Sequence, residues 1–559
     1  MKKFAKRFAL LSLTGVVATT SLVGCGSSSN DNNSSNQASA ATGPSGTTVI
    51  AISSLNGIFS PFFSQTSYDR VIHDAVHEYL IEIDRDGFMI PNLASVEMEE
   101  ITTDGNIQTV YTFKLKEGLT FSDGESITAD DIIFNYKVYA DPTYDGALTV
   151  SSLPIVGLQD YKYGDATEIS GIKKIDDLTV EVTIDGVDPS AIHSLRIAVL
   201  PEHYYGEGFV KGDLSGVKSK NGTPMGAGPY IFEDYSNNVV SLKFNETYFQ
   251  GTPNIEKIKF QLIDSANAFE AVRSGQVDIA DPSASPDMIK MVEDAGLHYE
   301  LIDHNAYGYV GINAERIPDI NVRKGLMHLM NRGPSIESYY GPYASVIERP
   351  MTQVSWAYPS DAEEVYGYDK QKAMEYFELA GYEDVNGKLM KDGEQLRIEV
   401  GIAGNGIMDH PVAPLLMQMK VDLENMGAVF EVMDTDTSLF FDKIMLEEWD
   451  MWTAGWTGSA DPDLYRYFHT DGSTAYHAFS DAEIDAILEA SRQTLDTNEL
   501  SNLYAEALDM IMEHAIIMPV YQRQNLYVFN PEMIDVYSLP ENMTPYYLFY
   551  DELQNLQMK

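Results

Sequence analysis

The sequence predicts an α/β protein built from more than one lobe, and two observations carry this prediction. The chain has 559 residues, and about 510 remain after an N-terminal targeting segment and tether, enough for several hydrophobic cores. In the second half, segments with strand and helix patterns alternate, whereas the first half mixes them. This pattern predicts α/β lobes with an insertion rich in antiparallel strands.

The first 24 residues have the pattern of a signal peptide rather than of a folded element. Lys2, Lys3, Lys6 and Arg7 precede an apolar stretch that is too short and wrongly flanked for a lasting membrane span. This stretch ends at Cys25, the only cysteine of the chain, so no intramolecular disulfide can form. The position of Cys25 predicts lipidation rather than burial in a core.

Residues 25–46 predict a flexible tether, because they are rich in Ser, Asn, Gly and Ala and contain almost no large apolar side chain. After residue 47 no long, charge-free apolar run occurs, so the mature chain is expected to contact the membrane only through its lipid. The formal net charge of -47 argues against nucleic acid as a partner. Most of that charge is expected to keep an exported protein soluble.

Strands and helices of the first half follow from apolar periodicity and cap residues. A turn at 53–57, containing Asn56, follows the first strand. Gly226 to Tyr230 form a tight break in the chain before a later strand. The expected strands are 47–52, 110–115, 177–184, 239–244 and 277–280, and the expected helices are 68–83, 128–139 and 266–274.

The second half alternates more regularly between the two patterns. A glycine at 381 ends one of its helices. The expected helices are 322–330, 370–380, 411–426, 482–492 and 500–515, and the expected strands are 396–402, 429–433, 450–454 and 516–521.

The stretch from Trp449 to Asp463 is the strongest candidate for a binding site. Small residues from 455 to 460 surround the single large ring of Trp456 and allow the backbone to approach a ligand closely. Trp456 offers an apolar wall and Asp461 an acceptor-only carboxylate. The competing interpretation is a strand end with core tryptophans followed by a polar turn.

Several motifs in order resemble the solute-binding proteins of peptide ABC importers. The most specific is G-L-T-F-S-D-G-E-S-I-T-A-D-D-I-I-F-N-Y at 118–136, and Leu22-Val23-Gly24-Cys25 resembles the lipobox of bacterial lipoproteins. The resemblance covers essentially all of 47–530. Its other marks are Ser60-Pro61, 91–94, 200–203, 226–230, 274–278, 321–324, 380–382, Gly455-Trp456 with Asp461-Pro462, 479–485 and 519–521.

The resemblance implies a periplasmic-binding-protein-like clamp of two lobes that closes on its ligand. Lobe 1 would comprise 47–290 and 516–559, with a subdomain near 68–220, and lobe 2 would comprise 291–515. Such a chain would be a lipid-anchored monomer that binds a peptide, needs no cofactor and passes its solute to a membrane permease driven by an ATPase. It would not be an enzyme, and the loop around 455–461 would face the cleft.

The resemblance also names the ligand contacts. In relatives an Asp three residues after the Gly-Trp tryptophan pairs with the peptide ammonium; here that position is Ser459, and the loop is one residue shorter. Asp461 or Asp463 is then the substitute acceptor. The arginine of dipeptide binders has no counterpart in 401–414, which contains only His410, so a longer peptide or another cationic solute is favoured. The expected contacts are Trp456, Thr457, Gly458, Ser459, Asp461, Asn56 and His410.

Two alternatives remain open. The same fold could bind a nickel chelate, an oligosaccharide or a signalling peptide, because the chain is rich in Tyr and also contains four Trp. A metal-dependent hydrolase is more distant: His73 and His77 have metal-ligand spacing on a helix, but the residues between them are Asp-Ala-Val instead of a zinc-protease motif. They are expected to be partly exposed helix histidines that bind no metal.

Overall fold

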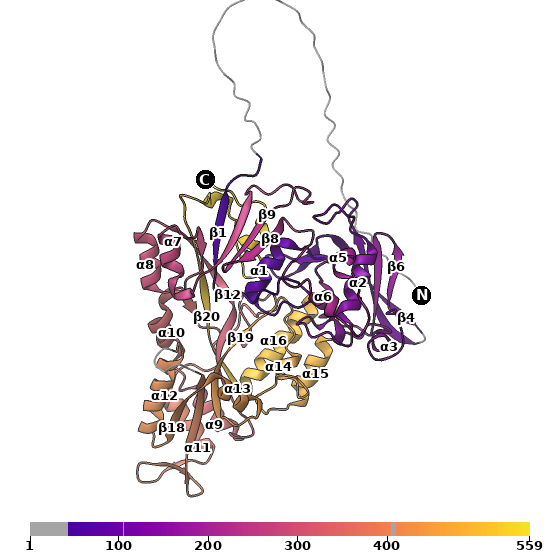
Figure 1. Ribbon diagram of the computed structural model, residues 1–559. Coiled ribbons are helices and arrows are strands. Elements are labelled where there is room, and N and C mark those ends of the chain that lie inside the picture. The colour runs from indigo at the N-terminus through magenta and orange to yellow at the C-terminus, as the bar shows by residue number, and fades with distance from the viewer. Residues whose placement is uncertain (1–42, 104, 404–409) are drawn as a thin grey trace, which may run out of the picture. The chain divides into compact units, whose positions relative to one another are not determined.

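The computed structural model describes residues 43–103, 105–403 and 410–559 (Figure 1). Its central feature is an 11-stranded sheet in the order β18-β17-β19-β12-β20-β11-β1-β10-β9-β8, with β13 paired to β20. The strands of this sheet are β1 Thr47–Ile52, β8 Tyr230–Ser236, β9 Val239–Phe244, β10 Lys257–Leu262, β11 Ile279–Ala280, β12 His298–Ile312, β13 Ala344–Ser345, β17 Arg397–Ala403, β18 Val429–Thr435, β19 Met451–Thr457 and β20 Ile517–Phe529.

Two long antiparallel strands, β12 and β20, join the two halves of the sheet. Ile302 and Phe529 belong to a buried cluster with β1, β9 and β10, whereas Val310 and Met518 belong to a cluster with β17 and α12 (Ala413–Asn425). The pairing of the two strands is irregular between Asp303 and Tyr307. The two strands therefore supply side chains to both hydrophobic cores, and their irregular part lies between those cores.

A second antiparallel sheet, in the order β4-β5-β7-β6, forms the insertion in the first half. Its strands and α2 enclose a separate core that runs from Phe62 to Ala227. In Figure 1 the labels β4, β6, α2, α3 and α5 gather on one side of the large sheet. These elements are β4 Ala94–Thr103, β5 Asn106–Leu115, β6 Ile172–Asp176, β7 Thr179–Asp185, α2 Ala129–Tyr139, α3 Leu158–Tyr163, α4 Ala191–Leu195, α5 Glu202–Tyr205 and α6 Ser215–Lys218.

The longest family motif has a structural role in this insertion. The Asp131 carboxylate accepts the backbone N–H of Thr128 at 2.9 Å and its hydroxyl at 3.2 Å, which completes a capping box at the start of α2. Asp123 accepts the N–H of Glu125 at 3.1 Å in the preceding turn. The motif therefore starts a helix and turns the chain, as its residue types predict.

The remaining helices pack against the large sheet, and the described residues contain no helix long and apolar enough to cross a membrane. Two small sheets, β2-β3 and β14-β15-β16, complete the fold. These elements are α7 Ala268–Arg273, α8 Pro286–Asp294, α9 Ile320–Met327, α10 Arg332–Tyr340, α11 Lys370–Leu379, α13 Thr437–Met445, α14 Tyr465–Phe468, α15 Ala482–Ser491, α16 Thr497–Glu513, β2 Ile81–Ile83, β3 Met89–Pro91, β14 Glu383–Asp384, β15 Leu389–Lys391 and β16 Glu394–Gln395.

The helix predicted over 68–83 is shorter in the structure and spans Ser67–Val76 as α1. Its C-cap, His77, has extended backbone angles, and the Leu80 N–H donates to the Ile197 carbonyl at 3.0 Å. Tyr79 and Leu80 continue the apolar spacing of the helix, yet a β-bridge from Tyr79 to Ala198 holds them extended. Tertiary strand pairing has overridden the local helical pattern.

His73 and His77 are buried rather than partly exposed, with 5% and 2% of their surface accessible. The His77 ring lies within hydrogen-bond distance of the His73 carbonyl, 2.9 Å, and of the Tyr205 hydroxyl, 3.2 Å. Burial lowers the pKa of His73 to about 4 and that of His77 to about 3, so both rings are neutral at physiological pH. Within the described residues no group of three or more His, Cys, Asp or Glu could hold a metal ion.

Candidate functional site

The candidate stretch begins as a strand of the large sheet and becomes a loop later than its sequence suggests. β19 pairs antiparallel with β12 and parallel with β17. Trp452 is buried, whereas Trp456 is only partly covered. The sequence predicts that the turn starts at Gly455, and this start is wrong. Gly455 to Thr457 still pair with Ala306 to Gly308, and the loop begins at Gly458. The loop therefore leaves the carboxyl end of β19, the end at which ligands bind in α/β sheets.

A small pocket lies against this loop and encloses about 40 Å³. A cavity of roughly 10–15 Å³ already holds one water molecule, so this pocket takes a small group such as an ammonium and not a whole peptide. Any larger ligand must extend beyond it. The lining residues are Tyr307, Pro350, Met351, Thr352, Ser355, Trp456, Gly458, Ser459, Asp461, Pro462, Asp463, Leu464 and Tyr467.

Gly458 is required by the close approach of its loop to Asn305 of β12 and to Thr352. Its N–H donates to the Asn305 carbonyl at 2.8 Å. A Cβ at this position would lie 2.6 Å from Asn305 Oδ1 and 3.2 Å from Thr352 Oγ1, two atoms that are themselves hydrogen-bonded at 2.8 Å. A larger residue would have to displace this pair, so the glycine allows Asn305 and Thr352 to support this part of the pocket, called the pocket floor here.

Asp461 contributes a carboxylate that has one hydrogen bond and no cationic partner. Its Oδ1 accepts the backbone N–H of Asp463 at 3.2 Å, and its carbonyl accepts the Ser459 hydroxyl at 2.6 Å. Among the ion pairs of the described residues none involves Asp461. Burial, reinforced by the charge of Asp463, raises the pKa of Asp461 to about 7. The Asp461 side chain therefore both stabilises the turn and offers an acceptor for an added cation.

Asp463, the other candidate acceptor, is already engaged. Its carboxylate forms an ion pair with the Arg492 guanidinium and accepts the N–H of Tyr465 at 3.0 Å. The Arg492 charge lies 3.8 Å from the centre of the Tyr465 ring. A ligand cation would have to compete with this arginine for Asp463, whereas Asp461 forms no ion pair within the described part of the chain.

An aromatic wall completes the pocket. The rings of Trp456 and Tyr467 meet edge to face, with centroids 3.8 Å apart and planes at 78°. The Tyr307 hydroxyl donates to the Pro350 carbonyl at 3.0 Å, which fixes its ring from the opposite strand. The pocket therefore combines apolar faces with two carboxylates, of which Asp463 is paired with Arg492.

Three of the predicted contacts do not line the pocket. Thr457 lies next to Trp456 in the strand, so its side chain leaves the opposite face of the sheet. The backbone N–H of Asn56 donates to Asp69 at 3.0 Å, in the turn after β1. His410 accepts the N–H of Val412 at 3.2 Å in front of α12, and burial lowers its pKa. Cys25, the signal peptide and nearly all of the tether lie outside the described residues.

The other walls come from segments that the sequence did not single out. Tyr307 lies on β12, Met351 and Thr352 follow β13, and Tyr467 lies in α14. Nothing in their local pattern separates them from core residues. Strand pairing places Tyr307 beside Trp456, Thr352 bonds to Asn305, and the Tyr467 ring packs on Trp456.

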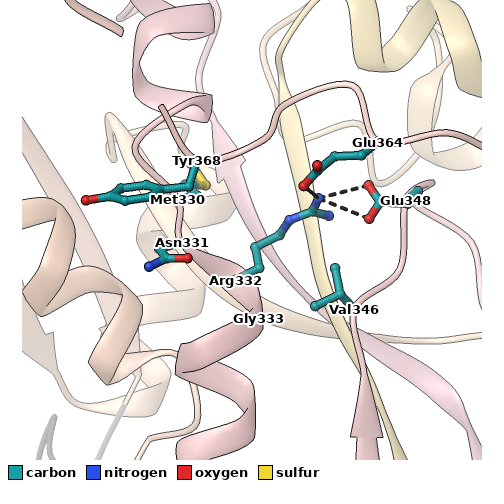
Figure 2. A pocket seen from close by; sticks show the side chains of 8 residues that line it. All are labelled: Met330, Asn331, Arg332, Gly333, Val346, Glu348, Glu364 and Tyr368. Carbon is teal, nitrogen blue, oxygen red and sulfur yellow. Dashed lines mark hydrogen bonds and ion pairs between the residues drawn. The ribbon is translucent and has the colours of Figure 1, made fainter. Parts of the chain in front are cut away.

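A second, larger pocket of about 310 Å³ lies at the start of α10 (Figure 2). Arg332 dominates it, but its guanidinium donates to Glu348 at 2.8 Å, to Glu364 at 3.3 Å and to the carbonyls of Ile347 and Pro519. With these partners the arginine is not free to bind an anion. We interpret this cluster as a structural ion pair that ties α10 to β20.

One sheet that runs through two hydrophobic cores, with a small pocket at the end of one of its strands, defines a two-lobe α/β clamp of the periplasmic-binding-protein class. The profile described as "Bacterial extracellular solute-binding proteins, family 5 Middle" matches residues 89–477. The chain therefore belongs to the family 5 extracellular solute-binding proteins, whose members serve transporters.

Individual relatives agree with this assignment. The oligopeptide-binding protein AppA of Bacillus subtilis is 24% identical over 555 residues, covering 96% of this chain and 97% of AppA. The substrate-binding protein CtaP of Listeria monocytogenes has a similar structure, with a TM-score of 0.75, 22% identity and coverage of 92% of this chain and 99% of CtaP. NikZ of Campylobacter jejuni, solved with Ni(L-His), gives a TM-score of 0.69 at 21% identity, covering 91% and 99%.

Proposed function

We propose that this chain is the lipid-anchored substrate-binding protein of an ABC importer and that it captures peptides, most suitably oligopeptides with a free amino terminus. The chain would pass its solute to a membrane permease driven by an ATPase. The similarity to AppA, an oligopeptide-binding protein, supports the solute class. The absence of an arginine or lysine in 401–414 supports ligands longer than a dipeptide.

The observation that carries the proposal is the partly buried Asp461 carboxylate without a cationic partner among the described residues. A peptide ammonium is a cation with several donors, and its burial is costly unless a carboxylate accepts it. The 40 Å³ pocket suits this group, with Ser459 and the ring of Trp456 beside it. The remainder of the peptide would lie between the two lobes.

In this arrangement the lobes would move about the part of β12 and β20 near Asp303 to Tyr307, where the ladder is irregular. The sequence divides the lobes into 47–290 with 516–559 and 291–515. In this arrangement the boundary between the lobes would instead lie within β12 and β20. A ligand closes such a clamp only by binding the closed state more tightly than the open one.

The test compares a free nonapeptide with its N-acetylated twin by calorimetry. Loss of one partner of a buried charge pair typically costs about 2–5 kcal/mol, so Asp461→Asn should weaken the free peptide about 30-fold or more. The acetylated peptide has no ammonium and should be affected much less. Equal losses for the two peptides would assign Asp461 to the turn before Pro462 alone.

Asp463→Asn is the matched control, because it removes a neighbouring carboxylate that already pairs with Arg492. It should not weaken the free peptide more than the acetylated one, because Asp461 keeps its carboxylate. Nickel–histidine chelate belongs in the same titration, since the structurally similar NikZ was solved with it. Tight binding of that chelate, with no binding of any peptide, would replace the proposed solute while leaving the transport class intact.

A further inference from the structure

Two aromatic side chains from the first lobe reach residues beside the pocket of the second. The ring of Phe88, at the tip of the β2–β3 hairpin, stacks on Trp356 with centroids 5.7 Å apart and planes at 29°. The Tyr546 hydroxyl donates a hydrogen bond to the Ser459 carbonyl at 3.4 Å, and it also faces Asn305 and Thr352. Phe88 remains 40% exposed in this contact.

The hairpin tip and the C-terminal segment that carry these rings are tied together. The Thr544 hydroxyl donates to the Arg85 carbonyl at 2.8 Å, and Arg85 pairs with Glu552 at 3.3 Å. Gly87 has φ of +91°, and a Cβ there would lie 3.2 Å from the ring of Tyr546. Movement of the hairpin must therefore carry Tyr546 with it.

The residues that receive the two rings belong to the wall of the pocket or adjoin it. Ser459 and Thr352 line the pocket directly. Trp356 follows Ser355, another lining residue, and packs against the second-lobe cluster that contains Tyr307 and Trp452. Contacts made by the first lobe thus fall next to Asp461 rather than at a remote edge.

We propose that Phe88 and Tyr546 form a two-ring latch that holds the closed clamp over the pocket and sets how long a ligand stays bound. Both are positioning residues, because they act on the ligand through Trp356 and the Ser459 loop. The inference rests on the proposed function for its ligand. Stacked aromatic pairs contribute about 0.5–1.5 kcal/mol beyond their buried area, so loss of the Phe88 ring should speed ligand release by up to roughly tenfold.

The kinetic test measures release of a fluorescent free-ended nonapeptide from Phe88→Ala. We expect faster release, with recovery in Phe88→Tyr, which keeps a stacking ring. Tyr163→Ala is the control, because Tyr163 is a 74% exposed aromatic residue of α3 in the same lobe. Unchanged release in Phe88→Ala, equal acceleration in the control, or no recovery by tyrosine would overturn the latch.

A second experiment needs no peptide and separates failure of the latch from failure of the proposed function. Phe88→Cys with Trp356→Cys, in a Cys25→Ser background, should be joined efficiently by a short bifunctional maleimide. The pair Tyr163→Cys with Trp356→Cys should not. If no peptide binds but only the first pair cross-links, the hairpin tip does meet Trp356 as the latch requires, and the proposed solute is wrong. Equal cross-linking of both pairs would refute the latch whatever the ligand.

Discussion

Asp461 should make this protein less stable as the pH rises, and its replacement should remove that dependence. In an unfolded chain its carboxyl titrates near 3.8, whereas burial raises its pKa in the fold to about 7. Between these values the folded protein keeps a proton that the unfolded chain releases, so the free energy of unfolding falls with rising pH. At about 1.36 kcal/mol per unit, the loss reaches about 4 kcal/mol above pH 7.

Asp461→Asn is therefore expected to stabilise the ligand-free protein more at pH 8 than at pH 5, by about 2–3 kcal/mol. The asparagine oxygen can still accept the N–H of Asp463, so the turn persists. Denaturant unfolding followed by tryptophan fluorescence suits the test, because all four Trp, at 356, 449, 452 and 456, lie in the second lobe.

Asp463→Asn should behave oppositely and lose stability, because it leaves Arg492 without its partner. Protonation of Asp461 should also affect ligand binding. Free-ended peptides should bind about 100-fold more weakly at pH 5 than above pH 7, because the Asp461 carboxylate must be ionised to pair with the ammonium. The reasoning is refuted if Asp461→Asn and the wild type keep the same pH slope, or if the mutant is less stable at pH 8.

Two further changes probe the anchor and the pocket floor. Cys25→Ser should move the protein from the membrane to the soluble fraction of cells, because it removes the proposed lipid attachment point; a variant that stays membrane-bound and lipidated would contradict the anchor. Gly458→Ala should push the Asn305 side chain off Thr352 and weaken free nonapeptides about tenfold in calorimetry, for about 1.4 kcal/mol; unchanged affinity would show that the pocket floor tolerates a methyl group.

Much of the fold could be predicted because its elements carry strong local signals. The first strand, 47–52, and the strand 239–244 have the bounds of β1 and β9. The 15-residue strand β12 was missed because Gly308 and Gly311 interrupt its apolar pattern. Those glycines are needed where the rings of Tyr521 and Trp452 leave no space for a Cβ, a constraint that only the folded sheet creates.

The candidate site was likewise predictable from the sequence only in part. Trp456, Gly458, Ser459 and Asp461 lie in one loop and its strand, so their sequence neighbourhood indicates a shared wall. The facing residues come from β12 and from the segment after β13, and nothing local marks them. Asp461 could be separated from Asp463 only after the structure placed Arg492 beside Asp463. The role of these residues as ligand contacts remains a prediction.

The central claim is that a solute closes two lobes over the Asp461 pocket, and small-angle scattering tests it most directly. The account predicts that a saturating free-ended nonapeptide reduces the radius of gyration, and that Asp461→Asn needs a higher peptide concentration for the same change. A peptide that binds tightly without any compaction, or compaction that is indifferent to Asp461, would contradict it.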